Sequence, residues 1–122
     1  MAKLSDEAKK AIGELGPALV ATANKNGKPN VSLKGSFRVL DDEHVIFADI
    51  ASPLTTANLR ENPQLSAIVF NAATRKGCRI WGKAAEILDS GNLFDTISAE
   101  YAAKGMKVKH VIKVKVDEVI TF

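Results

Sequence analysis

Strict alternation of apolar and polar residues limits the possible folds of this chain more than any other feature, because it runs through two long segments. In residues 30–40 the apolar positions alternate with serine, lysine and arginine, and in residues 108–122 they alternate mostly with lysine. Successive side chains of a strand point to opposite faces, so this period of two predicts half-buried β-strands. Gly35 lies inside the first segment and predicts a bulge or sharp bend there, as a closing barrel requires.

Shorter apolar segments bounded by turn residues predict the remaining strands. They cover residues 18–24, 44–49, 64–71 and 77–88. Asn26-Gly27 follows the first of them, and this dipeptide is typical of a type I′ hairpin turn, in which both central residues have positive φ. Six strands joined mostly by short turns predict an antiparallel barrel or sandwich with helices at its ends. The pattern alone does not choose between these two architectures.

Two short helices are predicted in the first half of the chain. Residues 5–15 have apolar residues at helical spacing, begin at Ser5 as N-cap and end before Gly16-Pro17. Residues 55–60 form the second helix, which Asn62-Pro63 ends because the residue before a proline avoids the helical region.

A third helix is predicted between Ser90, its N-cap, and Gly105, which follows its last turn. Its apolar face holds Leu93, Phe94, Ile97 and Tyr101. No repeat, linker or low-complexity tract interrupts the sequence, so residues 1–122 are predicted to form a single domain.

Composition is that of an ordinary soluble protein. Of the 122 residues, 46% are hydrophobic and 25% are charged, and the formal net charge is +3. No apolar run approaches the roughly 18 residues of a membrane span. Acidic residues interrupt the first fifteen positions, so we expect no signal peptide, and the single cysteine cannot form an intrachain disulfide. We therefore expect a cytoplasmic protein that does not enter a membrane.

Hydroxyl residues gather where the second helix begins. Ser52, Thr55 and Thr56 precede or open that helix. The first turn of a helix exposes unpaired N–H groups and the positive end of the helix dipole, so this segment suits a phosphate. The same residues also suit a simple helix cap at Thr55, and residue types alone leave both interpretations open.

Cations on neighbouring elements could reach such an anion. Lys34 and Arg38 share the polar face of one predicted strand, and Arg75 and Lys76 lie in a loop. Exposed lysines are usually only solvated, which is the alternative for each. Trp81 either fills the core or covers a flat ring.

No catalytic or metal-binding motif is present. His44 and His110 are far apart and lack carboxylate or cysteine partners at metal-ligand spacing. Cys78 has no neighbouring base, so we expect a small buried strand residue and no nucleophile. Nucleic-acid binding is not expected either, because few aromatic residues can stack on bases and several of them fit the core.

Four segments occur in an order and spacing that are specific when taken together. They are the hairpin Leu19–Ser32, the strands Lys34–Leu40 and Val45–Asp49, the segment Thr55–Pro63 and the strand Arg79–Ala84. Together they resemble the pyridoxamine 5′-phosphate oxidase-like family of FMN-binding split barrels, over about residues 17–88. The resemblance implies a mainly β fold, a six-stranded antiparallel split β-barrel of Greek-key type, with FMN bound at the interface of a homodimer.

The same resemblance implies which residues meet the cofactor. Those implied to contact or flank its ring and ribityl chain are Ser32, Leu33, Lys34, Ala48 and Asp49. Those implied to hold the phosphate, or to approach it or the ring from a neighbouring loop, are Ser52, Thr55, Thr56, Lys76 and Gly77. Trp81 is added as the residue that could cover the ring.

The chain departs from the family in two respects. Many members place a lysine in the phosphate loop, whereas Leu54 and Thr55 occupy that stretch here. The phosphate would then have to be bound by helix N–H groups, hydroxyls and a cation such as Lys34 or Lys76. The sequence also stops soon after the last predicted strand, without the extension that contacts the vitamin in true oxidases. We therefore do not expect it to oxidise pyridoxamine 5′-phosphate.

These observations predict an FMN flavoprotein that is an oxidoreductase or electron carrier, with a small molecule or protein as its redox partner. The flavin would carry the chemistry, since no side chain presents itself as acid, base or nucleophile. The alternative is a non-catalytic or differently loaded split barrel that binds haem or a deazaflavin.

Overall fold

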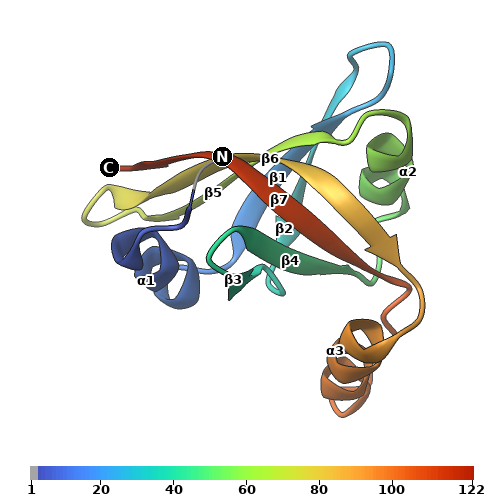
Figure 1. Cartoon of the computed structure of the whole chain (residues 1–122). Helices are drawn as coiled ribbons and strands as arrows, with labels where there is room; N and C mark the ends of the chain where they lie inside the picture. Colours follow the sequence, from blue (N-terminus) through green and yellow to red (C-terminus); the bar gives the residue numbers. More distant parts are fainter. Residues whose placement is uncertain (1–2) are drawn as a thin grey trace.

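A single antiparallel sheet of seven strands forms the centre of the molecule, as a computed structural model that describes residues 3–122 shows (Figure 1). The strands are β1 Ala18–Ala23, β2 Pro29–Lys34, β3 Arg38–Asp41, β4 His44–Asp49, β5 Gln64–Asn71, β6 Lys76–Leu88 and β7 His110–Thr121. Their order across the sheet is β2-β1-β5-β6-β7-β4-β3. The mainly β fold with short helices is thus confirmed.

The predicted count of six strands is wrong, because the segment 30–40 is not one strand. It breaks after Lys34, the chain turns at Gly35 and Ser36, and β3 begins at Arg38. The bend expected at Gly35 is therefore sharper than a bulge, and it sends β2 and β3 to opposite edges of the sheet. No strand pair among residues 3–122 joins these two edges, so hydrogen bonds do not close the sheet into a barrel.

Three helices flank the sheet: α1 Asp6–Glu14, α2 Pro53–Glu61 and α3 Asn92–Ala102. Ser5 caps α1 as expected, its side chain accepting a hydrogen bond from the Ala8 N–H. Helix α2 begins two residues earlier than predicted, because proline suits the first turn of a helix. The cap predicted for α3 is wrong: Gly91, with φ of +98°, occupies the N-cap position in place of Ser90.

The hairpin between β1 and β2 differs from the predicted type I′ turn. Only Gly27 has positive φ, at +83°, and Asn26 does not. The Asn24 carbonyl accepts a hydrogen bond from Gly27 N–H, while the Asn24 side chain accepts from the N–H groups of Asn26 and Lys28. An asparagine one position before the expected turn thus favours a longer loop with a single left-handed glycine.

The core lies on both faces of β4. Val45 and Phe47 point into the main core, which α1 helps to cover. Ile46 and Ala48 point the other way and pack with Ile97 of α3. This strand is therefore buried on both sides, and it places its last residues between the main core and α3.

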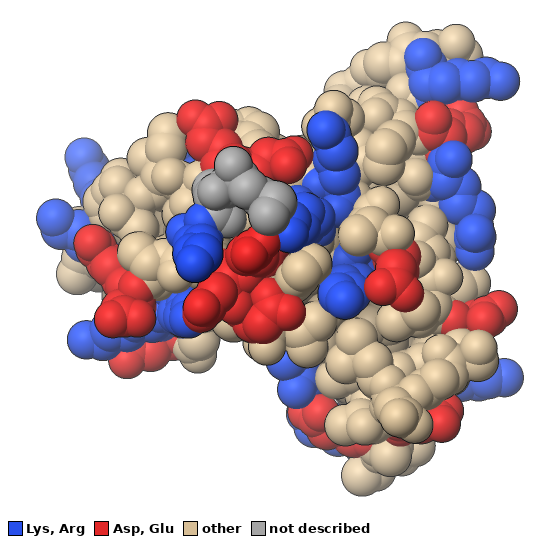
Figure 2. Space-filling model, viewed as in Figure 1, with Lys and Arg blue, Asp and Glu red and all other residues tan. Residues whose placement is uncertain are grey.

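Charges of both signs are mixed over the face shown in Figure 2. Lysine and arginine side chains alternate there with aspartate and glutamate and form no continuous basic stripe. Lys115 and Glu43 form an ion pair 2.6 Å apart that joins β7 to the β3–β4 turn. This face of the described residues thus lacks the large basic surface typical of a nucleic-acid-binding protein.

Candidate functional site

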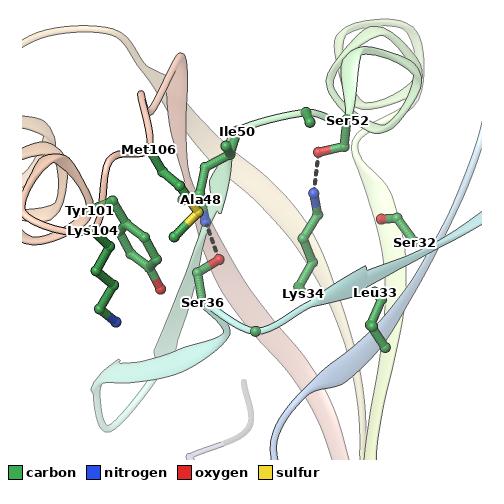
Figure 3. Close-up of a pocket in the computed structure, with 12 residues that line it drawn as sticks. Ser32, Leu33, Lys34, Ser36, Ala48, Ile50, Ser52, Tyr101, Lys104 and Met106 are labelled. Atoms are coloured by element: carbon green, nitrogen blue, oxygen red, sulfur yellow. Dashed lines mark hydrogen bonds between the residues drawn. The ribbon is translucent and has the colours of Figure 1, made fainter.

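A cavity of about 580 Å³ lies where β2 ends, beside the end of β4 and the start of α2 (Figure 3). This volume falls within the range of small-molecule sites. One wall comes from the end of β2, a second from the segment between β4 and α2, and a third from the end of α3 and the loop after it. The residues implied by the family resemblance that line it are Ser32, Leu33, Lys34, Ala48 and Ser52.

Lys34 is the central cation of this cavity. It is only 6% exposed, and its Nζ donates a hydrogen bond to Ser52 Oγ (Figure 3). The amine also lies 5.8 Å from the centre of the Phe47 ring. No carboxylate of residues 3–122 forms an ion pair with it. Burial lowers the pKa of this amine, and the charge of Asp49 only partly opposes that.

Asp49 lies behind the cavity wall and organises the start of α2. Its carboxylate accepts hydrogen bonds from Ser52 N–H at 3.1 Å, Ser52 Oγ at 3.2 Å and Thr56 Oγ1 at 2.6 Å. His110 Nδ1 lies 3.1 Å from the same carboxylate. Burial alone would raise the pKa of this 2% exposed acid, but the hydrogen bonds from Thr56, His110 and Ser52 outweigh burial and lower it. Asp49 is therefore a charged, fully partnered group.

The two threonine hydroxyls at the start of α2 already have internal partners. Thr55 Oγ1 lies 2.9 Å from Ser32 Oγ, and Thr56 donates to Asp49. Both residues are buried, and neither lines the cavity. Thr55 is not the helix cap, because α2 begins at Pro53 and Ser52 occupies the N-cap position, without a side-chain capping bond. Their contact with a phosphate stays a prediction that would require these partners to be exchanged.

The double change Thr55→Ala with Thr56→Ala is therefore expected to lower stability by about 2–3 kcal/mol, because each loses a buried hydrogen bond. If the two hydroxyls only hold the start of α2 in place, the affinities for FMN and riboflavin should fall by the same factor. Thermal unfolding with parallel titration of both flavins measures this. A loss confined to FMN would show instead that the hydroxyls bind the phosphate directly.

The third wall was not predicted from the sequence. Tyr101, Lys104 and Met106 line it, and the Lys104 amine lies 5.1 Å from the centre of the Tyr101 ring (Figure 3). Arg38 holds this wall in place, since its guanidinium bonds both carboxylate oxygens of Glu100 at 3.1 and 2.9 Å. Arg38 is thus engaged with α3, and the ligand role considered for it is not supported by its position.

Three of the implied residues lie away from the cavity. Lys76 and Gly77 line a smaller cavity of about 320 Å³ beside α1. Trp81 is half-buried on the opposite face of β6 from Ile80, with the Arg79 guanidinium 5.8 Å from its ring centre. One chain alone does not bring these three residues to Lys34, and their role at a cofactor stays a prediction.

Cys78 is buried, at 1% exposed, as expected for a strand residue. Burial raises the pKa of its thiol to about 11, so it is protonated at neutral pH. We expect Cys78→Ala to cost about 1 kcal/mol of stability and to leave flavin binding unchanged. Denaturant unfolding and a flavin titration test this, and weaker flavin binding by the folded variant would contradict it.

Two further findings concern metals and membranes. Within residues 3–122, no three or more histidine, cysteine, aspartate or glutamate side chains are grouped to hold a metal ion. None of the helices described here is long and apolar enough to cross a membrane.

Comparison with known proteins gives the same fold and one family. The sequence model described as pyridoxamine 5′-phosphate oxidase matches residues 4–122. No curated protein matches the chain by sequence. The structure of HupZ from Group A Streptococcus is 26% identical, with a TM-score of 0.86, and the match covers 97% of this chain and 93% of that one.

Two more distant structures share the fold. An FMN-binding protein from Syntrophomonas wolfei is 20% identical with a TM-score of 0.87, covering 97% of this chain and 85% of that one. HutZ, the heme storage protein from Vibrio cholerae, is also 20% identical, with a TM-score of 0.73 and coverage of 99% and 95%. At this identity the likeness establishes the fold alone.

Proposed function

Because the chain belongs to the pyridoxamine 5′-phosphate oxidase family, we propose that it is a flavoprotein that binds FMN and acts as an oxidoreductase or electron carrier. The observation that carries this proposal is the environment of Lys34, a buried amine that lines the cavity of about 580 Å³ and makes no carboxylate ion pair among the described residues. Such an amine suits an anionic ligand group, because a buried cation is costly without one.

The rest of the cavity fits the other parts of FMN. Ser32 and Ser52 lie beside Lys34 and provide hydroxyls for a phosphate or ribityl chain. Ala48, Ile50 and Met106 provide apolar surface for a flat ring. Bound FMN supplies the electron-transfer chemistry, while the protein binds it, orients it and sets the charge around it.

We also propose that two chains form the complete site. The cavity is open to solvent, and Val31 and Leu33 of the edge strand β2 are 62% and 65% exposed. Exposed apolar strand faces of this kind often mark an interface. A second copy covering β2 would bury these residues, and Lys76, Gly77 and Trp81 would then be candidates to reach the cofactor from the partner.

Sedimentation at micromolar concentration is expected to give twice the chain mass of 13.1 kDa. The double change Val31→Glu with Leu33→Glu should give a monomer, because it places charges on the apolar surface of β2. The control change Leu40→Glu alters an exposed apolar residue of β3, at the opposite edge of the sheet from β2, and should stay dimeric. A native protein that sediments as a monomer would contradict the shared site.

The cofactor itself is tested by releasing the ligand from native protein and measuring its mass. FMN is the expected result, and the purified protein should be yellow and reversibly bleached by a reductant. A colourless protein that also fails to bind added FMN would refute the proposal. A haem or deazaflavin mass would favour the alternative, for which the likeness to HutZ is the supporting observation in the case of haem.

A further inference from the structure

A continuous series of hydrogen-bonded side chains leads from the cavity to another part of the surface. Lys34 Nζ donates to Ser52 Oγ, and Ser52 Oγ donates to Asp49 at 3.2 Å. The other carboxylate oxygen of Asp49 lies 3.1 Å from His110 Nδ1. The His110 side chain is 26% exposed and does not line the cavity. A titratable group outside the cavity is thus connected to the cation inside it.

The order of charges in this series matters. Asp49 lies between Lys34 and His110, and its carboxylate is 2% exposed. Two charged groups contact the His110 ring: Asp49 of β4, and Arg60 of α2, whose guanidinium nitrogen lies 3.4 Å from Nε2. When His110 is protonated, Asp49 has a cationic partner on the side away from the cavity. When His110 is neutral, the same carboxylate acts mainly on Lys34 and offsets its charge.

We propose that His110 is a positioning residue of this cavity, which acts through Asp49 and Ser52 on Lys34 so that anionic ligands bind more tightly when the imidazole is protonated. The inference rests on the proposed function, because it takes the cavity to hold an anionic flavin. His110 would then be a regulatory group of that site, and its charge would control the affinity for anionic ligands.

The expected size of the effect follows from Coulomb's law at an intermediate dielectric constant. One added charge beyond an intervening carboxylate should change an equilibrium constant on the order of five- to tenfold. Imidazoles in general change charge between about pH 5 and 8, and this range sets the two pH values of the test. The phosphate of FMN also titrates near pH 6, but that contribution is the same for every variant.

The test compares FMN with riboflavin, which lacks the phosphate, at about pH 5.5 and about pH 8. The variant His110→Asn keeps an N–H donor for Asp49 and removes the titratable charge. The matched control is His44→Asn, which alters a histidine paired with Asp41 in the β3–β4 turn. In the native protein and in the control, we expect the FMN-to-riboflavin affinity ratio at low pH to exceed that of His110→Asn by five- to tenfold. At high pH the three proteins should agree.

A second measurement does not need a flavin. NMR of ¹³C-labelled lysine follows the Lys34 amine in the ligand-free protein, and its signal should shift as His110 titrates in the native chain but not in His110→Asn. If the protein binds no flavin, the proposed function fails, and this lysine signal still decides the inference. A Lys34 signal unaffected by His110, or equal affinity ratios in native and His110→Asn proteins, would overturn it.

Discussion

Replacing Lys34 with methionine is expected to weaken FMN binding roughly 10- to 100-fold, because a charge-assisted hydrogen bond to a buried anion is worth about 1.5–3 kcal/mol. Riboflavin has no phosphate, so its affinity should change far less. Methionine keeps most of the length of the lysine side chain, so little volume is lost beside the Phe47 ring, whose centre lies 5.8 Å from the lysine amine. Titration of the ligand-free protein with both flavins measures the difference.

The ligand-free variant should also be more stable at neutral pH. Burial lowers the folded-state pKa of Lys34 below its ordinary value of 10.5, so the unfolded chain binds this proton more tightly than the folded one. The resulting penalty is present below the lowered pKa, and it is lost as the pH rises through that value towards 10.5. Lys107→Met is the control, since Lys107 is exposed and does not line the cavity. Equal losses for FMN and riboflavin in Lys34→Met would contradict the phosphate contact.

The second large effect is expected at Gly77. A Cβ added there would lie 2.2 Å from the Val69 carbonyl oxygen and 2.9 Å from the Phe70 Cα, both backbone atoms of the neighbouring strand. Strand β5 would have to move, so we expect Gly77→Ala to destabilise the protein by about 3 kcal/mol or more. Urea unfolding of the variant measures this loss.

Gly13→Ala is the matched control for this change. Gly13 lies near the end of α1, is exposed and has nothing within 4 Å of an added Cβ. Alanine should therefore stabilise that helix by about 0.5–1 kcal/mol. If Gly77→Ala unfolds at the same urea concentration as native protein, close approach of β5 is not what requires glycine there. The role implied by the family resemblance, contact with a cofactor, would then be the remaining explanation.

Local sequence signals predicted most of the fold. Alternation found the segments of β2, β3 and β7, and apolar runs between turn residues found the other strands. Ser5 marked the start of α1. These local signals failed where the backbone turns although the alternation of apolar and polar residues continues. Residues 31–39 alternate without interruption, yet the turn at Gly35 divides them between two edges of the sheet. A period of two in apolar residues therefore cannot distinguish one continuous strand from two strands whose apolar positions stay in step.

The candidate site was predictable only where its residues are close in sequence. Ser32, Leu33 and Lys34 lie on one strand, and Ser52 follows β4 by three residues, so a family-like pattern identified them. Tyr101 and Lys104 reach the cavity because α3 packs on β4 through Ile97 and because Glu100 pairs with Arg38, 62 residues away in the chain. The internal partners of Thr55 and Thr56 likewise come from β2 and β4, and no local pattern reveals them.

The two edge strands of the sheet, β2 and β3, lie beside the cavity, so ligand exchange is expected to depend on local opening of the backbone there. One wall of the cavity is formed by the last residues of β2 and by Ser36, which lies just before β3. Only a short segment of chain joins these two edge strands. A ligand in the cavity would therefore bridge a gap that no backbone ladder of residues 3–122 spans. Edge strands open more readily than central ones, so we expect ligand release to accompany fraying of β2 and β3. The residence time of the ligand would then follow local opening at this gap, while the central strands stay intact.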